Sequence, residues 1–242
     1  MKTLEITTKV GCKNMCWYCP QDKLLDNYKG NTDLSFDSFK KILSNVPKNV
    51  KIEFSGFSEA FLNRESSFMM KYAIQKKYLV ELFTTIVGVT KEDVQHLKDC
   101  LFERIWFHQF DGQNEDEFNE KINWFKSKIK AKNYALTIVD KKYNNVLTRA
   151  GNLSDVKEQL GPLTCKSTAD FDHNVVLPNG DVYLCCMDWS LKHKIGNLFE
   201  THFDKLNRES IKILALQYKS NIICRKCELF DPIFKLPFEI KI

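Results

Sequence analysis

Three cysteines near the start of the chain have the spacing of a metal-binding loop. Cys12, Cys16 and Cys19 form the pattern C-x3-C-x2-C and directly follow a segment that alternates like a β-strand. Soft thiolates hold iron–sulfur clusters, and three of them leave one iron of a four-iron cluster open to an outside ligand. A zinc loop is the alternative, although zinc sites usually pair C-x2-C elements and close with four ligands. The spacing therefore favours a cluster with one open position.

A second set of cysteines lies in the last third of the chain and offers four thiolates: Cys165, Cys185, Cys224 and Cys227. Four ligands make a closed site, for which a zinc ribbon is the alternative to a cluster. Adjacent side chains diverge on an extended backbone, so Cys186 is not expected to share a cluster with Cys185. Cys100 ends an amphipathic segment and is interpreted as a buried apolar residue. In a reducing compartment, cysteines gathered at both ends favour metal ligation over disulfides.

The elements that must position these cysteines follow from the pattern of apolar residues. Strands are predicted at residues 4–10, 50–55, 79–85, 104–109 and 134–139. Amphipathic helices are predicted between them, at residues 35–46, 64–77, 91–100 (with Thr90 as N-cap) and 115–130. This alternation predicts an α/β fold with a parallel sheet. If the units close into a partial barrel, the chemistry is expected where the strands end.

The pattern changes near residues 151–164. Beyond Cys165, residues 174–177 and 182–184 predict a β-hairpin around the Asn179-Gly180 turn. We therefore expect a barrel over residues 1–155 and an extension over residues 156–242.

Composition restricts the class of protein. The chain has 242 residues, 43% of them apolar and 28% charged, which is typical of a soluble globular protein. No apolar run approaches the roughly 20 residues that span a bilayer, and the N-terminus does not look like a signal peptide. A cytoplasmic protein without a membrane partner is expected. The net charge of +5 is spread over short lysine segments, which are interpreted as solvated faces and predict no nucleic-acid partner.

The segment VGCKNMCWYCP around the first cysteines resembles the signature loop of the radical S-adenosylmethionine (SAM) superfamily. The resemblance implies a partial (β/α)6 TIM-like barrel and a 4Fe–4S cluster whose open iron chelates the amino and carboxylate groups of SAM. It also implies that Tyr18 lies near the adenine.

The ends of the next three strands carry further residues that match family positions. IEFSGFSEAF resembles the turn in which a glutamate meets the SAM amino group, and Gly56 and Glu59 match it. Thr84 matches a contact to the ribose or methionine part of SAM. Gln109 matches a polar SAM contact, and His108 is expected to face the opposite way on the same strand.

The C-terminal cysteines resemble the SPASM/Twitch extensions of these enzymes, which hold an auxiliary 4Fe–4S cluster. The G-x4-C spacing from Gly180 favours Cys185 as the ligand, and the single set of four resembles the one-cluster Twitch form. The wider resemblance is to 2-deoxy-scyllo-inosamine dehydrogenases, in which an arginine contacts the substrate. Arg149 in LTRAGNL matches that arginine, with an ordinary salt bridge as the alternative, and Asp188 is a second candidate for a catalytic contact.

The resemblance implies a radical SAM oxidoreductase. Such an enzyme cleaves SAM reductively to a 5′-deoxyadenosyl radical, abstracts hydrogen and oxidises an alcohol of a sugar or cyclitol by two electrons. Radical modification of a peptide is the alternative, but only eleven residues precede Cys12, so no leader-binding domain is expected there. A flavodoxin- or ferredoxin-type protein is expected as the electron donor.

Overall fold

The architecture is built on a parallel sheet that begins at the N-terminus. The computed structural model describes residues 1–232 except 15, 111, 140–147 and 169. Its first five strands lie in the order β5-β4-β3-β2-β1, and each pairs with the next in parallel. They are β1 (Thr3–Ile6), β2 (Lys51–Phe54), β3 (Val80–Thr84), β4 (Leu101–Phe110) and β5 (Lys130–Val139).

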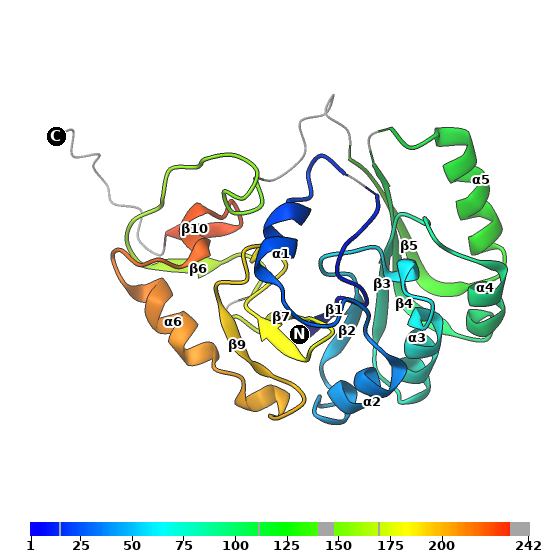
Figure 1. Ribbon diagram of the computed structural model, residues 1–242, viewed down its shortest axis with the longest axis horizontal. Helices are drawn as coiled ribbons and strands as arrows, with labels where there is room; N and C mark the ends of the chain where they lie inside the picture. The colour runs from blue at the N-terminus through cyan, green and yellow to red at the C-terminus, as the bar shows by residue number, and fades with distance from the viewer. Residues whose placement is uncertain (15, 111, 140–147, 169, 233–242) are drawn as a thin grey trace.

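Helices connect these strands, and all but the first cover the outer side of the sheet (Figure 1), whereas the first packs in a separate apolar cluster with Phe57 and Trp189. The helices are α1 (Gln21–Asn27), α2 (Phe36–Ser44), α3 (Ser66–Gln75), α4 (Lys91–Leu97) and α5 (Glu115–Lys126), with a short 3-10 helix η1 (Ala60–Leu62). The predicted N-cap of α4 is confirmed: Thr90 and Asp93 form a reciprocal capping box. None of the helices in the described part of the chain is long and apolar enough to cross a membrane.

Three strands differ in length from the predictions: β1 is shorter, and β4 and β5 are longer. β1 ends at Ile6, before the predicted residue 10, because the chain then leaves the sheet and makes only a bridge from Lys9 to Asp33. β4 and β5 are longer than predicted, since they pair from Leu101 and Lys130 to their far ends. Periodicity alone places the centre of a strand, whereas pairing partners decide its ends.

The second part of the chain continues the same sheet. β7 (His173–Val176) lies parallel to β1, and β8 (Asp181–Tyr183) and β9 (Lys194–Asn197) follow it in antiparallel order. The predicted hairpin is therefore confirmed as β7–β8. Among the described residues this makes a sheet of eight strands that crosses the boundary expected at residue 155. The α/β fold class predicted from the sequence is confirmed.

The remaining elements lie at the other end of the molecule from α5 (left in Figure 1). They comprise η3 (Phe203–Lys205), α6 (Arg208–Leu216), η4 (Ile223–Lys226) and a two-stranded ribbon of β6 (Leu163–Cys165) and β10 (Phe230–Pro232).

The two faces of the parallel strands differ in chemistry. Alternate residues of β1 and β2, such as Leu4, Ile6 and Ile52, are fully buried in the apolar core. The opposite face carries Glu5, Glu53 and Glu81 as direct neighbours across three strands. The inner side of the sheet is therefore polar, and its charges need partners because like charges directly opposite one another are destabilising.

Candidate iron–sulfur centres

The loop after β1 brings Cys12, Cys16 and Cys19 to one cavity at the carboxyl ends of the parallel strands. The cavity contains about 1130 Å³ of open space, counting its mouth, which is large enough for a nucleotide-sized ligand. Gln21, the first residue of α1, ties this loop to the turn after β2. Its Nε2 donates to the Phe57 carbonyl at 2.6 Å, and its Oε1 accepts from the Cys12 N–H at 3.5 Å.

The three thiols differ in acidity. A hydrogen bond between the Cys16 and Cys19 side chains lowers the pKa of Cys16 to about 7 and raises the pKa of Cys19. Burial raises the pKa of Cys12. Because the thiolate is the form that binds metal, cluster binding at this loop must release protons.

The turn after β2 requires a glycine. Gly56 has φ +76°, and a Cβ there would lie 2.3 Å from the Thr7 hydroxyl. That hydroxyl accepts from the Phe57 N–H at 3.3 Å, and the Gly56 N–H donates to Glu5 Oε2 at 3.1 Å. The turn is thus pinned against β1 and directs the following residues over the cavity.

Glu59 lies at the centre of a dense set of hydrogen bonds. Its Oε1 accepts from the Thr84 hydroxyl at 2.8 Å and the Phe61 N–H at 3.2 Å. Its Oε2 accepts from the Thr85 N–H at 2.6 Å and the Thr85 hydroxyl at 2.7 Å. Asn14, in the cysteine loop, donates to the Thr85 hydroxyl at 2.9 Å. Burial raises the pKa of Glu59, and the bonds from Thr85 and Thr84 oppose that shift. Four donors fill the acceptor positions of a carboxylate, so a further donor must share or displace one of them.

Arg149, near the end of the expected barrel segment in the sequence, lines the same cavity. Its Nε donates to the Tyr18 carbonyl at 3.4 Å, and its guanidinium carbon lies 5.8 Å from the centre of the Tyr18 ring. The structure therefore brings together two residues that are 131 positions apart.

One neighbouring pair on β4 lies opposite to expectation. His108 lines the cavity, whereas Gln109 is not among the residues that line it. The alternation between the two was predicted, but the side of the sheet that each faces depends on packing and was not. Burial and the charge of Arg149 lower the pKa of His108 to about 4, so its imidazole is neutral at physiological pH.

The four C-terminal cysteines line a second cavity together with Cys186 and mainly apolar side chains. Burial raises the pKa of the Cys227 thiol to about 11 and also raises the pKa of Cys185 and Cys224. All nine cysteines lie within the described residues, and each is free. The four ligands predicted for an auxiliary cluster therefore converge as thiols.

The spacing of the sulfurs bears on which metal group fits. Within the described residues, neither cysteine set brings three sulfurs within 4.8 Å of one another. A single zinc ion with bonds of about 2.3 Å holds its sulfurs about 3.8 Å apart.

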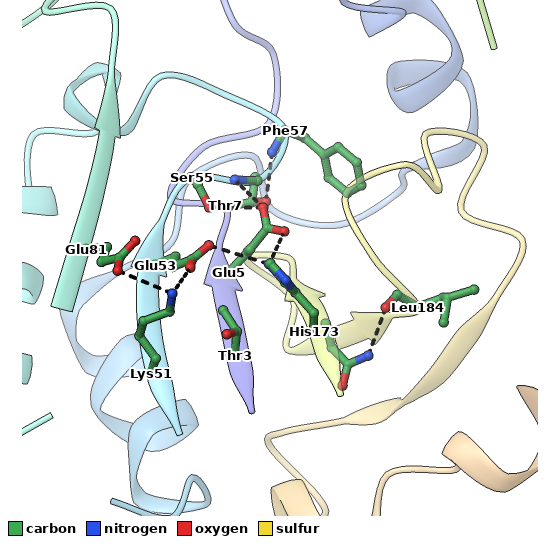
Figure 2. A network of polar contacts seen from close by, with 12 residues as sticks. Thr3, Glu5, Thr7, Lys51, Glu53, Ser55, Phe57, Glu81, His173 and Leu184 are labelled. Atoms are coloured by element: carbon green, nitrogen blue, oxygen red, sulfur yellow. Dashed lines mark hydrogen bonds and ion pairs between the residues drawn. The ribbon is translucent and has the colours of Figure 1, made fainter. Parts of the chain in front are cut away.

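A charged wall separates the two cavities. Glu5, His173 and Cys186 line both of them. His173 Nε2 lies 2.9 Å from Glu5 Oε1 and 3.5 Å from Glu53 Oε2 (Figure 2). Burial lowers the pKa of His173, but the hydrogen bonds and charges of the two carboxylates outweigh it and raise that pKa to about 10. The imidazolium therefore supplies the positive charge between these carboxylates.

Lys51 supplies a second positive charge, on the other side of Glu53 from His173. Its Nζ lies 2.7 Å from Glu53 Oε1 and 3.3 Å from Glu81 Oε1 (Figure 2). His173 and Lys51 together balance two of the three adjacent carboxylate charges.

Asp188 does not reach either cavity, contrary to the prediction of a catalytic contact. It is fully buried, and its carboxylate accepts from the backbone N–H groups of Lys192 and His193 at 3.0 and 2.7 Å. These bonds give Asp188 a structural role, because they fix the turn that leads into β9.

Several residues of the first cavity were not found from the sequence. Trp189 packs against Phe57 with ring centres 4.8 Å apart, and its buried indole N–H has no hydrogen-bond partner in the described structure. Glu5 and His173 also line the cavity. For Glu5 a signal was present, because a carboxylate in the middle of a buried strand needs a polar environment.

Comparisons with known proteins agree with this geometry. Residues 165–228 match the SPASM family, described as an iron–sulfur cluster-binding domain. No curated protein matches the chain. The fold is similar to that of BtrN in complex with AdoMet and 2-DOIA, with a TM-score of 0.70 and 17% identity over 96% of this chain and 94% of that one.

Two further solved structures share the fold. AnSMEcpe with bound AdoMet has a TM-score of 0.59 and 16% identity over 93% of this chain and 83% of that one. Streptococcus suis SuiB bound to precursor peptide SuiA has a TM-score of 0.59 and 12% identity over 94% of this chain and 69% of that one.

Residues 165–228 match an iron–sulfur cluster-binding domain, and the loop after β1 carries the C-x3-C-x2-C cysteines that line the first cavity. The chain thus carries a match to the SPASM cluster-binding domain at residues 165–228 and shares its fold with these solved structures.

Proposed function

We propose that the chain is a radical SAM oxidoreductase that oxidises an alcohol of a small polar substrate, such as a sugar or cyclitol, by two electrons. The observation that carries the proposal is the pair of cysteine-lined cavities that share the wall of Glu5, His173 and Cys186. In this proposal the first cavity starts the radical reaction, and the adjoining second cavity takes up an electron.

The residues of the first cavity fit a cluster with SAM bound to it. Cys12, Cys16 and Cys19 would hold three irons, and Glu59 would accept the SAM ammonium group. Tyr18, Gly56 and Thr84 line the same cavity, beside these groups. Gln109, predicted as a SAM contact, does not line this cavity.

The auxiliary cluster would be held by the four cysteines of the second cavity: Cys165, Cys185, Cys224 and Cys227. When bound, the two clusters and SAM supply one-electron cleavage of SAM, hydrogen abstraction by the 5′-deoxyadenosyl radical, and uptake of the remaining electron by the auxiliary cluster. We propose that the extension starts at residue 156 and that a flavodoxin- or ferredoxin-type protein is the donor.

The side chains around the first cavity support a polar substrate. Arg149 offers a fixed positive charge, neutral His108 an imidazole, and Trp189 an unused N–H donor. The Glu5 carboxylate also lines the cavity, where it is paired with His173. Groups of both charges suit a substrate with several hydroxyls, which can donate and accept hydrogen bonds. Arg149 is the group that we propose contacts the reacting part of the substrate.

The direct test is reductive cleavage of SAM. Reconstituted protein with dithionite and SAM is expected to form 5′-deoxyadenosine and methionine, with more product when a panel of sugars and cyclitols contains the substrate. Mass spectrometry of the stimulating compound should show the loss of two hydrogens. Stimulation by peptides alone would favour peptide modification, an alternative that the fold shared with peptide-bound SuiB supports. Absence of any 5′-deoxyadenosine would contradict both.

Replacing Glu59 with glutamine is expected to weaken SAM binding. Loss of a charge-assisted hydrogen bond costs about 1.5–3 kcal/mol, which corresponds to roughly 10- to 150-fold in Kd. The amide also lacks one of the two oxygens that now accept bonds from Thr84 and Thr85. Equilibrium dialysis of labelled SAM against the reconstituted protein measures the effect.

Glu65→Gln is the matched control. That carboxylate also accepts a backbone N–H, from Phe36 at 2.9 Å, but it lies outside the cavity. Its variant should bind SAM like the wild type. Equal SAM affinity of Glu59→Gln and wild type would remove Glu59 from the SAM site.

A further inference from the structure

The turn that carries Arg149 has an unusual backbone. Arg149, Ala150 and Gly151 have φ values of +55°, +53° and +75°, all in the left-handed region. Only glycine adopts that region freely, so two non-glycine residues in succession need support from their surroundings. The turn is closed by the Leu153 N–H, which donates to the Thr148 carbonyl at 3.0 Å.

The support comes from two segments of the auxiliary centre. Glu228 directly follows Cys227, and its Oε1 accepts the Thr148 N–H. Asn152 Nδ2 donates to the Arg149 carbonyl at 2.6 Å and to the Met187 carbonyl at 3.1 Å. Met187 lies two residues after Cys185. Each anchor of the turn therefore lies within two residues of an auxiliary cysteine in the sequence.

The other side of the turn faces the first cavity. Arg149 donates to the Tyr18 carbonyl, and its guanidinium lies beside the Tyr18 ring. Tyr18 is between Cys16 and Cys19 in the cysteine loop. A continuous chain of contacts thus runs from Cys227 through Glu228, Thr148 and Arg149 to that loop.

We propose that Glu228 and Asn152 are positioning residues that couple the auxiliary centre to the SAM site by holding the left-handed turn. A cluster on Cys185 and Cys227 fixes the segments that carry Met187 and Glu228, and these fix Arg149 against Tyr18. By linkage, SAM bound beside Tyr18 also favours the occupied auxiliary centre. The auxiliary cluster then has a role in SAM affinity that does not involve electron transfer. The inference rests on the proposed function, because SAM is its probe.

The test measures SAM binding to the oxidised, reconstituted protein, so that no turnover is needed. Glu228→Ala removes the acceptor and should raise the Kd for SAM at least about fivefold, the lower end of typical coupling between sites. Glu228→Gln keeps an oxygen that accepts the Thr148 N–H and should lie nearer the wild type. Iron content should not change in either variant, since all the cysteines remain.

Asp155→Ala is the matched control from the same neighbourhood. Asp155 pairs with Lys226 at 3.2 Å, but its side chain is 94% exposed to solvent. An exposed ion pair contributes little, so SAM affinity should match the wild type.

A double-mutant cycle distinguishes positioning of Arg149 from general loosening. If Glu228 acts through Arg149, then Glu228→Ala should add little to the effect of Arg149→Met, whereas independent effects would add in full. Asn152→Ala alters the same turn at a residue that is far in sequence from every cysteine. If Glu228→Ala loses auxiliary iron, the SAM affinity of Asn152→Ala decides whether the turn couples the two centres. Unchanged SAM affinity in these variants, or full additivity with Arg149→Met, would overturn the coupling and leave the proposed function standing. A wild-type protein that does not bind SAM would overturn both.

Discussion

Replacing Cys12, Cys16 and Cys19 together with alanine is expected to remove about half of the bound iron and all SAM cleavage. Two four-iron clusters give the wild type about eight irons, and the variant keeps only those of the auxiliary centre. The thiols line one cavity beside Glu59, and SAM cleavage needs the open iron that they would hold. Iron analysis after anaerobic reconstitution, together with assay of 5′-deoxyadenosine, measures both effects.

Cys100→Ala is the control for this experiment. Cys100 is buried in the apolar core away from both cavities, so its loss should leave iron content and SAM cleavage unchanged. If the triple variant keeps eight irons and still forms 5′-deoxyadenosine, the N-terminal loop does not hold the reactive cluster.

The parts of the site that the sequence predicted are those with local signals. The cysteine loop has a spacing that is meaningful within eight residues, and the Thr90 cap needs only its own helix. Gly56 was predicted from its match to the family turn, and the structure gives the physical reason for a glycine there, since a Cβ would lie 2.3 Å from the Thr7 hydroxyl. In these cases the residue types and their spacing already contain the physical constraint.

The parts that the sequence did not predict depend on distant segments. The pleat of β4 determines that His108 and Gln109 face opposite ways, but contacts with other strands determine which one faces the cavity. Asp188 was expected in the site, whereas the backbone of the turn before β9 surrounds it. The parallel pairing of β7 with β1 has no local signal at all. The predictions that differ from the structure are therefore those that depend on long-range packing, and none of them concerns the cysteine spacing.

The wall between the cavities shows why the second cluster is proposed as an electron acceptor. Glu5, His173 and Cys186 are the side chains that the two cavities share. Cys186 follows Cys185, and burial raises the pKa of its thiol, so it stays protonated beside Glu5. Because these three side chains line both cavities, the two proposed sites adjoin, which supports the proposal that an electron left on the substrate passes to the second cluster.

Replacing Cys227 with alanine is expected to abolish substrate oxidation while SAM cleavage remains measurable. The change removes one of four thiols from the second cavity, where Cys227 is buried, and the auxiliary cluster should be lost with about four irons. Saturating SAM is needed in this assay, because the coupling through Glu228 lowers SAM affinity when the auxiliary centre is empty. The measurements are iron content, 5′-deoxyadenosine, and two-electron oxidation of the substrate found in the screen.

The rival role for the auxiliary cluster is structural, since metal binding can contribute much of the folding free energy of a small unit. Circular dichroism and thermal unfolding of Cys227→Ala show whether the extension is folded. Cys186→Ala should retain about eight irons, because its side chain is not expected to ligate the cluster, and Cys100→Ala should retain oxidation as well. A folded Cys227→Ala protein that lacks the auxiliary cluster yet oxidises substrate at the wild-type rate would show that the cluster is structural. The substrate's second electron would then have to leave by another route, and the dehydrogenase proposal would lose the acceptor on which it depends.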